Sequence, residues 1–204
     1  MGKKLLAALA QGHPAHWATR GPQPGWSAPL GAAIGETPPW WLMRQAGRYL
    51  PAYQAVRQAA GGFMALALNP ALACEVTLQP VQTFGMSGAI LFSDILMVPY
   101  GLGLQVDFVA GDGPQVEAVT SLDRLAACTW QPPRVAAVIA ALNQLRQTLA
   151  QQFPTTTLIG FAGAPWTVAL YCCPGAHQKG MSWAPQVAWL QQHPVLATRL
   201  IETL

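Results

Sequence analysis

Two short runs of apolar residues stand out along the chain. Residues 89–92 (Ala-Ile-Leu-Phe) and 157–161 (Thr-Leu-Ile-Gly-Phe) have the length and continuity of strands buried on both faces of a parallel sheet. Between them, after Pro132 and Pro133, lies the clearest amphipathic pattern in the sequence. Its apolar residues recur at the three- and four-residue steps of one helix face: Val135, Val138, Ile139, Leu142, Leu145 and Leu149. The order strand, helix, strand indicates a parallel α/β unit.

Proline, glycine and asparagine mark the ends of the other expected elements. We predict further helices over residues 52–60, 71–83, 168–172, 183–192 and 194–204. Residues 102–114 alternate apolar and polar positions among glycines, which predicts a β-hairpin. Residues 12–37 are rich in glycine and proline and have no periodicity, so we interpret them as an irregular insertion or loop. The whole chain, residues 1–204, is interpreted as a single domain.

Composition excludes two classes of partner. The 204 residues carry a formal net charge of +3, and the 11 basic residues form no run or stripe, so we expect no nucleic-acid partner. Although 52% of the residues are apolar, no apolar stretch reaches the roughly 18 residues that a membrane span requires. We therefore expect a core-rich protein without a membrane span.

Cysteine and histidine do not form a recognisable metal site. The spacings of Cys74, Cys128, Cys172 and Cys173 match neither a zinc pattern nor a redox pair. We interpret these residues as reduced, mostly buried thiols of a cytoplasmic protein. The four histidines fit no metal-ligand pattern either.

An unusual pair of arginines follows the apolar residues Trp40 to Met43. Only 9% of the chain is charged, yet Arg44 and Arg48 lie four residues apart beside Gly47. A short strand ending at this point would place two planar, permanently charged donors in a loop, where they suit carboxylate or phosphate groups. The alternative is a helical turn that carries two solvated arginines.

A carboxylate follows the first apolar run. Asp94 comes two residues after residues 89–92. The carboxyl end of a buried parallel strand is where α/β barrels carry their catalytic groups. The alternative is that Asp94 caps the turn that follows the strand.

The second apolar run leads into a loop of small residues and then a tyrosine. Gly163, Ala164 and Pro165 would let the backbone approach a ligand closely, or would allow tight packing of strand against helix. Tyr171 falls one helical turn beyond this loop. It could donate a hydrogen bond to a ligand, or it could pack in the core with its hydroxyl bonded to backbone.

Three blocks, in this order, resemble the uroporphyrinogen decarboxylase family: residues 43–51 (Met-Arg-Gln-Ala-Gly-Arg-Tyr-Leu-Pro), residues 90–96 (Ile-Leu-Phe-Ser-Asp-Ile-Leu), and residues 160–167 (Gly-Phe-Ala-Gly-Ala-Pro-Trp-Thr) followed by Tyr171. The resemblance implies an α/β fold, the (β/α)8 TIM barrel. It also implies a cytoplasmic homodimer that converts uroporphyrinogen III to coproporphyrinogen III in haem or chlorophyll synthesis. The reaction removes carbon dioxide from the acetate arms of the substrate and needs no cofactor and no metal.

The same resemblance implies roles for individual residues. Asp94 would accept hydrogen bonds from the pyrrole N–H groups and stabilise the protonated pyrrole intermediate. Arg44 and Arg48 would hold the carboxylate arms, and Arg44 would be the available proton donor. Tyr171 would add a hydrogen bond. The remaining substrate-binding positions belong to the arginine block: Gln45, Ala46 and Gly47.

The sequence contains only about three or four strand-helix units, whereas a complete barrel typically needs about 250 residues. We therefore expect an incomplete barrel, the amino-terminal half of the family's chain. Residues 173–182 depart from the family, in which a glycine-rich loop with an acidic residue usually follows the tyrosine. The alternatives are a non-catalytic fragment that binds tetrapyrroles or dimerises, and a relative of the corrinoid-linked methyltransferases.

Overall fold

The computed structural model describes residues 39–43, 50–109, 113–176 and 182–204, which form two compact units. Residues 12–37, expected to be an irregular insertion, lie outside the described residues. The first unit includes residues 70–92 and 140–160 together with the described residues before Ala60. The second includes residues 60–69, 93–139 and the described residues after Gly160. The prediction of one domain over the whole chain stays a prediction.

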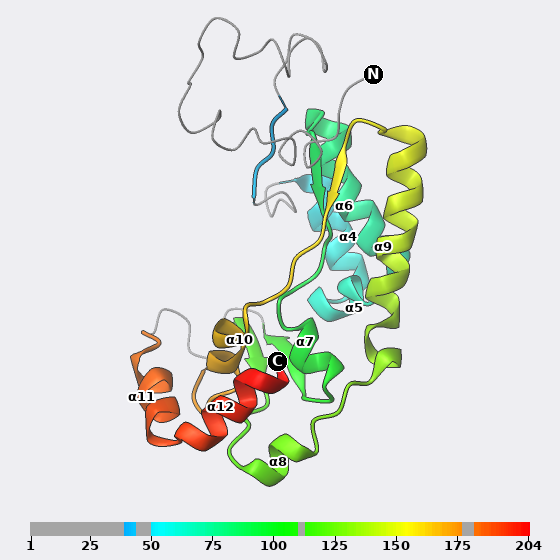
Figure 1. The fold of residues 1–204 in the computed structure, drawn as a ribbon. Helices are drawn as coiled ribbons and strands as arrows, with labels where there is room; N and C mark the ends of the chain where they lie inside the picture. Colours follow the sequence, from blue (N-terminus) through cyan, green and yellow to red (C-terminus); the bar gives the residue numbers. More distant parts are fainter. Residues whose placement is uncertain (1–38, 44–49, 110–112, 177–181) are drawn as a thin grey trace, which may run out of the picture. The chain divides into compact units, whose positions relative to one another are not determined.

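The first unit contains the parallel strand pair that the sequence predicts (Figure 1). β1 (Gly88–Ile90) pairs in parallel with β4 (Thr157–Ile159), and Gly88 lies opposite Thr157. α6 (Pro70–Phe84) packs against β1, and α4 (Pro51–Ala60) precedes it in the chain. The strands are shorter than the apolar runs because the pairing ends within each run.

α9 (Pro132–Gln152) is the long helix that directly precedes β4 in the chain (Figure 1). In the first unit it buries Ala141, Leu145 and Leu149, which follow one another at four-residue steps. The buried thiol of Cys74 on α6 donates a hydrogen bond to the Ala141 carbonyl over 3.3 Å. Ile139, which the sequence pattern assigns to the buried face, is 53% exposed. The helix is therefore correctly predicted, but part of its buried face is not.

A third segment lies beside β1 without being a regular strand. The Ser87 amide donates to the Trp40 carbonyl over 3.0 Å, and the Trp40 amide donates to the Ser87 hydroxyl over 3.2 Å. A Cβ at Gly88 would lie 3.0 Å from the Trp41 ring. The contacts advance in the same direction along both segments, as they do between parallel neighbours. Residues 39–43 therefore run alongside β1 toward the edge where β1 and β4 end.

Hydrogen bonds also fix the point at which the chain leaves β1. The Leu91 amide donates to the Ile159 carbonyl over 3.0 Å, which extends the pairing with β4 by one residue. The next amide, that of Phe92, donates over 2.9 Å to the buried hydroxyl of Thr77 on α6. The Phe92 ring also packs on Tyr53 of α4, with ring centroids 5.8 Å apart. Leu91 and Phe92, the residues directly after β1, are therefore held by contacts with β4, α6 and α4.

The second unit is built around a β-hairpin and short helices. β2 (Val106–Val109) pairs antiparallel with β3 (Gly113–Val116), which confirms the predicted hairpin. Its helices are α5 (Phe63–Ala67), α7 (Met97–Gly101), α8 (Leu122–Ala126), α10 (Pro165–Tyr171), α11 (Ala184–Gln192) and α12 (Pro194–Thr203). The sequence pattern does not predict α5, α7 and α8, because five residues are too few to show a helical period.

One apolar core joins these elements of the second unit. Its buried residues come from the hairpin and from the helices around it: Leu96, Leu104, Val106, Val116, Val119, Leu125, Val168, Ala169, Cys172, Leu196 and Leu200. α10 and α11 both pack against α12. This core therefore fixes α10, the helix that ends at Tyr171.

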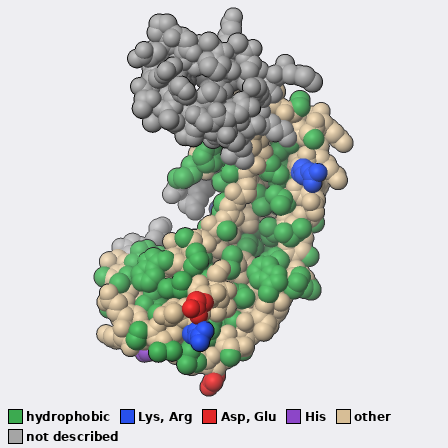
Figure 2. Space-filling view, viewed as in Figure 1, with side chains coloured by type: hydrophobic (Ala, Val, Ile, Leu, Met, Phe, Trp, Pro, Cys, Tyr) green, Lys and Arg blue, Asp and Glu red, His purple; other side chains and the backbone are tan. Residues whose placement is uncertain are grey.

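The described residues show a mixed helix and strand structure with two separate two-stranded sheets, and no closed sheet occurs among them. The α/β class and one parallel pair thus agree with the barrel expected from the sequence. Figure 2 shows apolar side chains over much of the visible face of the described residues and few charged ones. The most exposed large apolar side chains include Trp130, Met43 and Val195. In the described part of the chain, no helix has the length and apolar character that crossing a bilayer requires.

All four cysteines are free thiols, and three of them are buried. Burial raises the pKa of Cys172 to about 12 and that of Cys173 to about 11. Because the thiolate is the reactive form, both residues are inert near neutral pH. The interpretation of these adjacent cysteines as buried thiols is confirmed.

We expect Thr77→Val to weaken the fold, because the substitution keeps the side-chain shape but leaves the buried Phe92 amide without its acceptor. The expected loss in the free energy of unfolding is about 1–3 kcal/mol, measured by urea denaturation of the 204-residue chain. The Thr77 hydroxyl also donates to the carbonyl of Ala73, one turn earlier. Thr198→Val is the matched control, because the Thr198 hydroxyl donates in the same way to the carbonyl of Pro194, but at an exposed position. Equal losses in the two variants would contradict the role assigned to Thr77.

Candidate functional site

Asp94 lies in the turn between β1 and α7. Its Oδ1 atom accepts a hydrogen bond from the Leu96 amide over 2.9 Å, and its carbonyl accepts from the Met97 amide over 3.2 Å. The turn-cap alternative raised by the sequence is therefore correct for one carboxylate oxygen. Oδ2 has no hydrogen-bond partner among the described residues. One oxygen of Asp94 holds the turn, and the other is available to a ligand.

The surroundings of Asp94 disfavour its charge. Burial raises the pKa of this carboxyl above its ordinary value, and the Leu96 amide opposes the rise only in part. Within the described ranges, no lysine or arginine forms an ion pair with Asp94. A cationic or N–H-rich ligand would therefore relieve a cost that the folded chain carries.

Tyr171 ends α10 and lies within electrostatic reach of Asp94. Pro165 opens this helix, where its fixed φ and missing N–H suit the first turn. The Tyr171 ring packs against the core of the second unit. Burial raises the pKa of the Tyr171 hydroxyl, and the negative charge of Asp94 raises it further. The structure thus brings together two of the predicted site residues within the second unit.

Gly163 explains how the loop before α10 comes so close to the Asp94 turn. A Cβ at this position would overlap the Val168 side chain and lie 3.0 Å from the Cβ of Ile95. Ile95 is the residue directly after Asp94. Of the two explanations for the small residues in this loop, tight packing is the one that holds at Gly163.

The arginine block lies outside the described residues, and with it Arg44, Gln45, Ala46, Gly47 and Arg48. The segment that leads into the block is described. It runs beside β1 in the first unit and ends at Met43, whose side chain is 70% exposed.

Sequence reasoning missed one residue that contacts Tyr171. Trp183, directly before α11, meets the Tyr171 ring edge-on, with ring centroids 4.9 Å apart and an angle of 69° between the rings. Its only sequence signal is a large aromatic residue just after the segment that departs from the family, and this signal predicts no particular contact.

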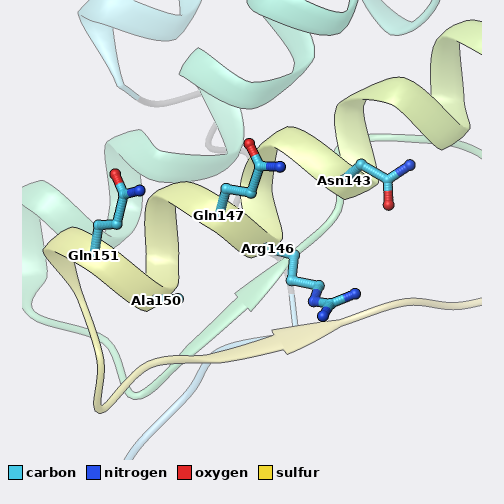
Figure 3. Close-up of a pocket in the computed structure, with 5 residues that line it drawn as sticks. All are labelled: Asn143, Arg146, Gln147, Ala150 and Gln151. Carbon is cyan, nitrogen blue, oxygen red and sulfur yellow. The ribbon is translucent and has the colours of Figure 1, made fainter.

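A hollow elsewhere on the surface carries no comparable chemistry. Figure 3 shows it along one helix, α9, where it is lined by Asn143, Gln147, Ala150 and Gln151 and by one charged residue, Arg146. None of the predicted site residues lines it. In the part of the chain that the structure describes, no group of three or more histidine, cysteine or acidic residues could hold a metal ion.

Comparison with known proteins identifies the family. The model of the uroporphyrinogen decarboxylase family matches residues 32–204. This chain belongs to the uroporphyrinogen decarboxylase family. The match includes the arginine block, Asp94 and Tyr171, although the comparison assigns no role to any of them.

Individual relatives carry the same name. Uroporphyrinogen decarboxylase of Rhodospirillum rubrum is 46% identical over 179 residues, which are 86% of this chain and 50% of the relative. The enzyme of Granulibacter bethesdensis is 51% identical over 144 residues, or 70% of this chain and 42% of the relative. The enzyme of Paracoccus denitrificans is 52% identical over 142 residues, which are 68% of this chain and 40% of the relative. The chain spans about half the length, or somewhat less, of these curated relatives.

We expect Asp94→Asn to stabilise the chain at neutral pH. Because burial raises the folded-state pKa, the Asp94 carboxyl contributes stability while it is protonated, below its unfolded pKa of about 4. That contribution is lost as the pH rises through the folded-state pKa. An asparagine stays neutral and keeps an oxygen that can accept from the Leu96 amide.

Urea denaturation at several pH values measures this effect. The advantage of Asp94→Asn over the wild type should be largest near pH 7 and shrink as the pH falls toward about 4. Asp107→Asn removes an exposed carboxylate from the same unit and serves as the control. A variant less stable than the wild type at pH 7 would show that the charge of Asp94 stabilises the fold.

We also expect Asp94→Asn to lower the pKa of the Tyr171 hydroxyl, because the substitution removes the neighbouring negative charge. Phenolate absorbance measures the titration, and the difference from Tyr171→Phe isolates this tyrosine. The same difference taken in the Asp94→Asn background should titrate at lower pH. An unchanged titration would mean that the two side chains are not neighbours in solution.

Proposed function

We propose that this chain carries the amino-terminal strand-helix units of a (β/α)8 barrel and belongs to an enzyme that decarboxylates uroporphyrinogen III to coproporphyrinogen III. Family membership and the three matching sequence blocks support this activity. The observation that carries the proposal is Asp94, which keeps one oxygen unpaired in a partly desolvated turn beside Tyr171.

The proposed reaction uses the substrate itself as the electron acceptor. Protonation of a pyrrole ring carbon gives a cationic ring. The bond between the acetate methylene and its carboxylate then breaks, its electron pair moves into the ring, and carbon dioxide leaves. A proton added to the resulting exocyclic carbon completes the methyl group, and loss of the proton first added to the ring carbon restores the neutral pyrrole. Because the ring accepts the electrons, we propose that no cofactor and no metal takes part.

Asp94 would lower the barrier by interacting more strongly with the cationic ring than with the neutral one. An ion pair at about 4 Å is worth roughly 4 kcal/mol at an effective dielectric of about 20. This energy corresponds to a rate increase of about a thousandfold. The raised pKa of this half-buried carboxyl fits this role, because a cationic ligand would restore the charge that desolvation disfavours.

The other site residues would bind the acidic arms of the substrate. Arg44 and Arg48 would each offer a planar fork of donors to a carboxylate, and the backbone of Gln45, Ala46 and Gly47 would complete this segment. Tyr171 would donate from its hydroxyl. Arg44 is also the candidate proton donor, although a guanidinium pKa above about 12 makes it a weak acid.

We also propose a cytoplasmic homodimer. Free cysteines are typical of a reducing compartment. Exposed apolar side chains such as Trp130 and Val195, together with open sheet edges, suit an interface between two copies. The alternative function is a non-catalytic fragment that binds tetrapyrroles or dimerises, and the observation that favours it is coverage of about half the length of the relatives.

Assays of the 204-residue chain with uroporphyrinogen III test the activity. Release of carbon dioxide, with a drop of about a thousandfold in Asp94→Asn, is the result expected for the enzyme. Asp107→Asn should retain wild-type rates because this carboxylate is exposed on β2. Turnover by Asp94→Asn close to the wild-type rate would rule out the electrostatic role.

Equilibrium binding separates the enzyme from the non-catalytic alternative. Binding of uroporphyrinogen without release of carbon dioxide would support the fragment. Affinity lost in the double variant Arg44→Ala with Arg48→Ala would then assign the carboxylate contacts. Absence of any binding would reject both functions. Size-exclusion chromatography of the same samples tests the dimer.

A further inference from the structure

The Tyr171 side chain is held in place by packing. Its hydroxyl has no hydrogen-bond partner among the described residues. Its ring contacts the core of the second unit and the ring of Trp183. Tyr171 is also the last residue of α10, a seven-residue helix, and helix ends are held less firmly than helix centres. The direction of the hydroxyl therefore depends on the neighbours of the ring.

Trp183 is itself anchored next to the end of α10. The buried side chain of Gln186, on the first turn of α11, donates over 3.3 Å to the carbonyl of Pro174, three residues beyond Tyr171. Farther along α11, Leu190 packs with Leu170 and Cys173 in a small buried cluster. These contacts hold the start of α11 against the end of α10. The contact between Trp183 and Tyr171 is therefore part of a packed arrangement.

We propose that Trp183 is a positioning residue, which holds the Tyr171 ring and thereby fixes the direction of its hydroxyl in the proposed substrate site. The expected effect on substrate binding rests on the proposed function, whereas the effect on the position of Tyr171 does not. Trp183 follows residues 173–182, where the chain departs from the family pattern. The aromatic contact would thus take over the task of fixing Tyr171 in this chain.

The geometry suits this role. An edge-on contact at 4.9 Å and 69° is a favoured arrangement of two aromatic rings, and it restricts the rotation of the tyrosine ring about its side-chain bonds. Trp183 is 37% exposed, so much of the indole is buried against its neighbours. A smaller aliphatic side chain would leave the outer side of the Tyr171 ring uncovered.

The first test reads the position of Tyr171 and needs no substrate. In Trp183→Leu, the proton resonances of the Tyr171 ring should shift, because the indole ring current is lost, and the phenol should titrate at lower pH because it is less buried. Trp183→Phe should restore the phenol titration toward that of the wild type. Trp130→Leu removes another exposed tryptophan of the same unit and should change neither signal. Unchanged Tyr171 signals in Trp183→Leu would overturn the proposal.

The second test links the position of Tyr171 to binding. Trp183→Leu should weaken the equilibrium affinity for uroporphyrinogen by up to about tenfold, and Trp183→Phe should recover most of it. In a Tyr171→Phe background, the same Trp183→Leu change should have little further effect, because the hydroxyl that Trp183 positions is already gone. A full additional loss in that background would mean that Trp183 acts independently of Tyr171, and would overturn the proposal.

The two tests fail separately. If no form of the chain binds uroporphyrinogen, the proposed function is wrong, while the resonance and titration data still decide whether Trp183 positions Tyr171. If the chain binds uroporphyrinogen and Trp183→Leu disturbs Tyr171 without changing the affinity, Trp183 has no role in the substrate site.

Discussion

The hydrogen bond from the Phe92 amide to the Thr77 hydroxyl fixes the point at which the chain leaves β1. A buried amide must find an acceptor, and the bond to the Ile159 carbonyl of β4 is made by the preceding amide, that of Leu91. A threonine on α6 meets this need from the helix that packs on the strand. The chain passes into the second unit directly after Phe92, and Asp94 follows two residues later. The end of the strand segment in the first unit is therefore fixed by a packed helix as well as by the strand pairing.

Asp94 combines a structural task with a property suited to chemistry. Its Oδ1 atom holds the turn into α7, and the burial that accompanies this task raises its pKa. Its charge in turn raises the pKa of the Tyr171 hydroxyl. A carboxyl in such surroundings gains most from a cationic ligand, because the ligand offsets the cost of desolvation. The same burial therefore disfavours the charge in the free chain and favours it in the proposed complex.

Packing between its own elements holds the second unit together. The chain spans about half the length, or somewhat less, of the curated relatives named above, and the sheets of the described residues are open. The second unit is held together by buried apolar clusters and by contacts such as that between Tyr171 and Trp183. The described residues also have open strand edges and exposed tryptophans, and these are the features that a protein interface would cover.

Local pattern alone determined the strands near residues 89–92 and 157–161, the long helix α9 and the hairpin, because each extends over enough residues to show its period. Ordered motifs likewise indicated the family and, through that resemblance, named Asp94 and Tyr171 among the candidate site residues. Contacts between distant segments decided the rest. No periodicity in the sequence shows which surfaces will meet. That is why the sequence did not predict the five-residue helices, the exposure of Ile139 or the contact of Trp183 with Tyr171. For the same reason it did not show that one Asp94 oxygen holds the turn while the other has no partner among the described residues.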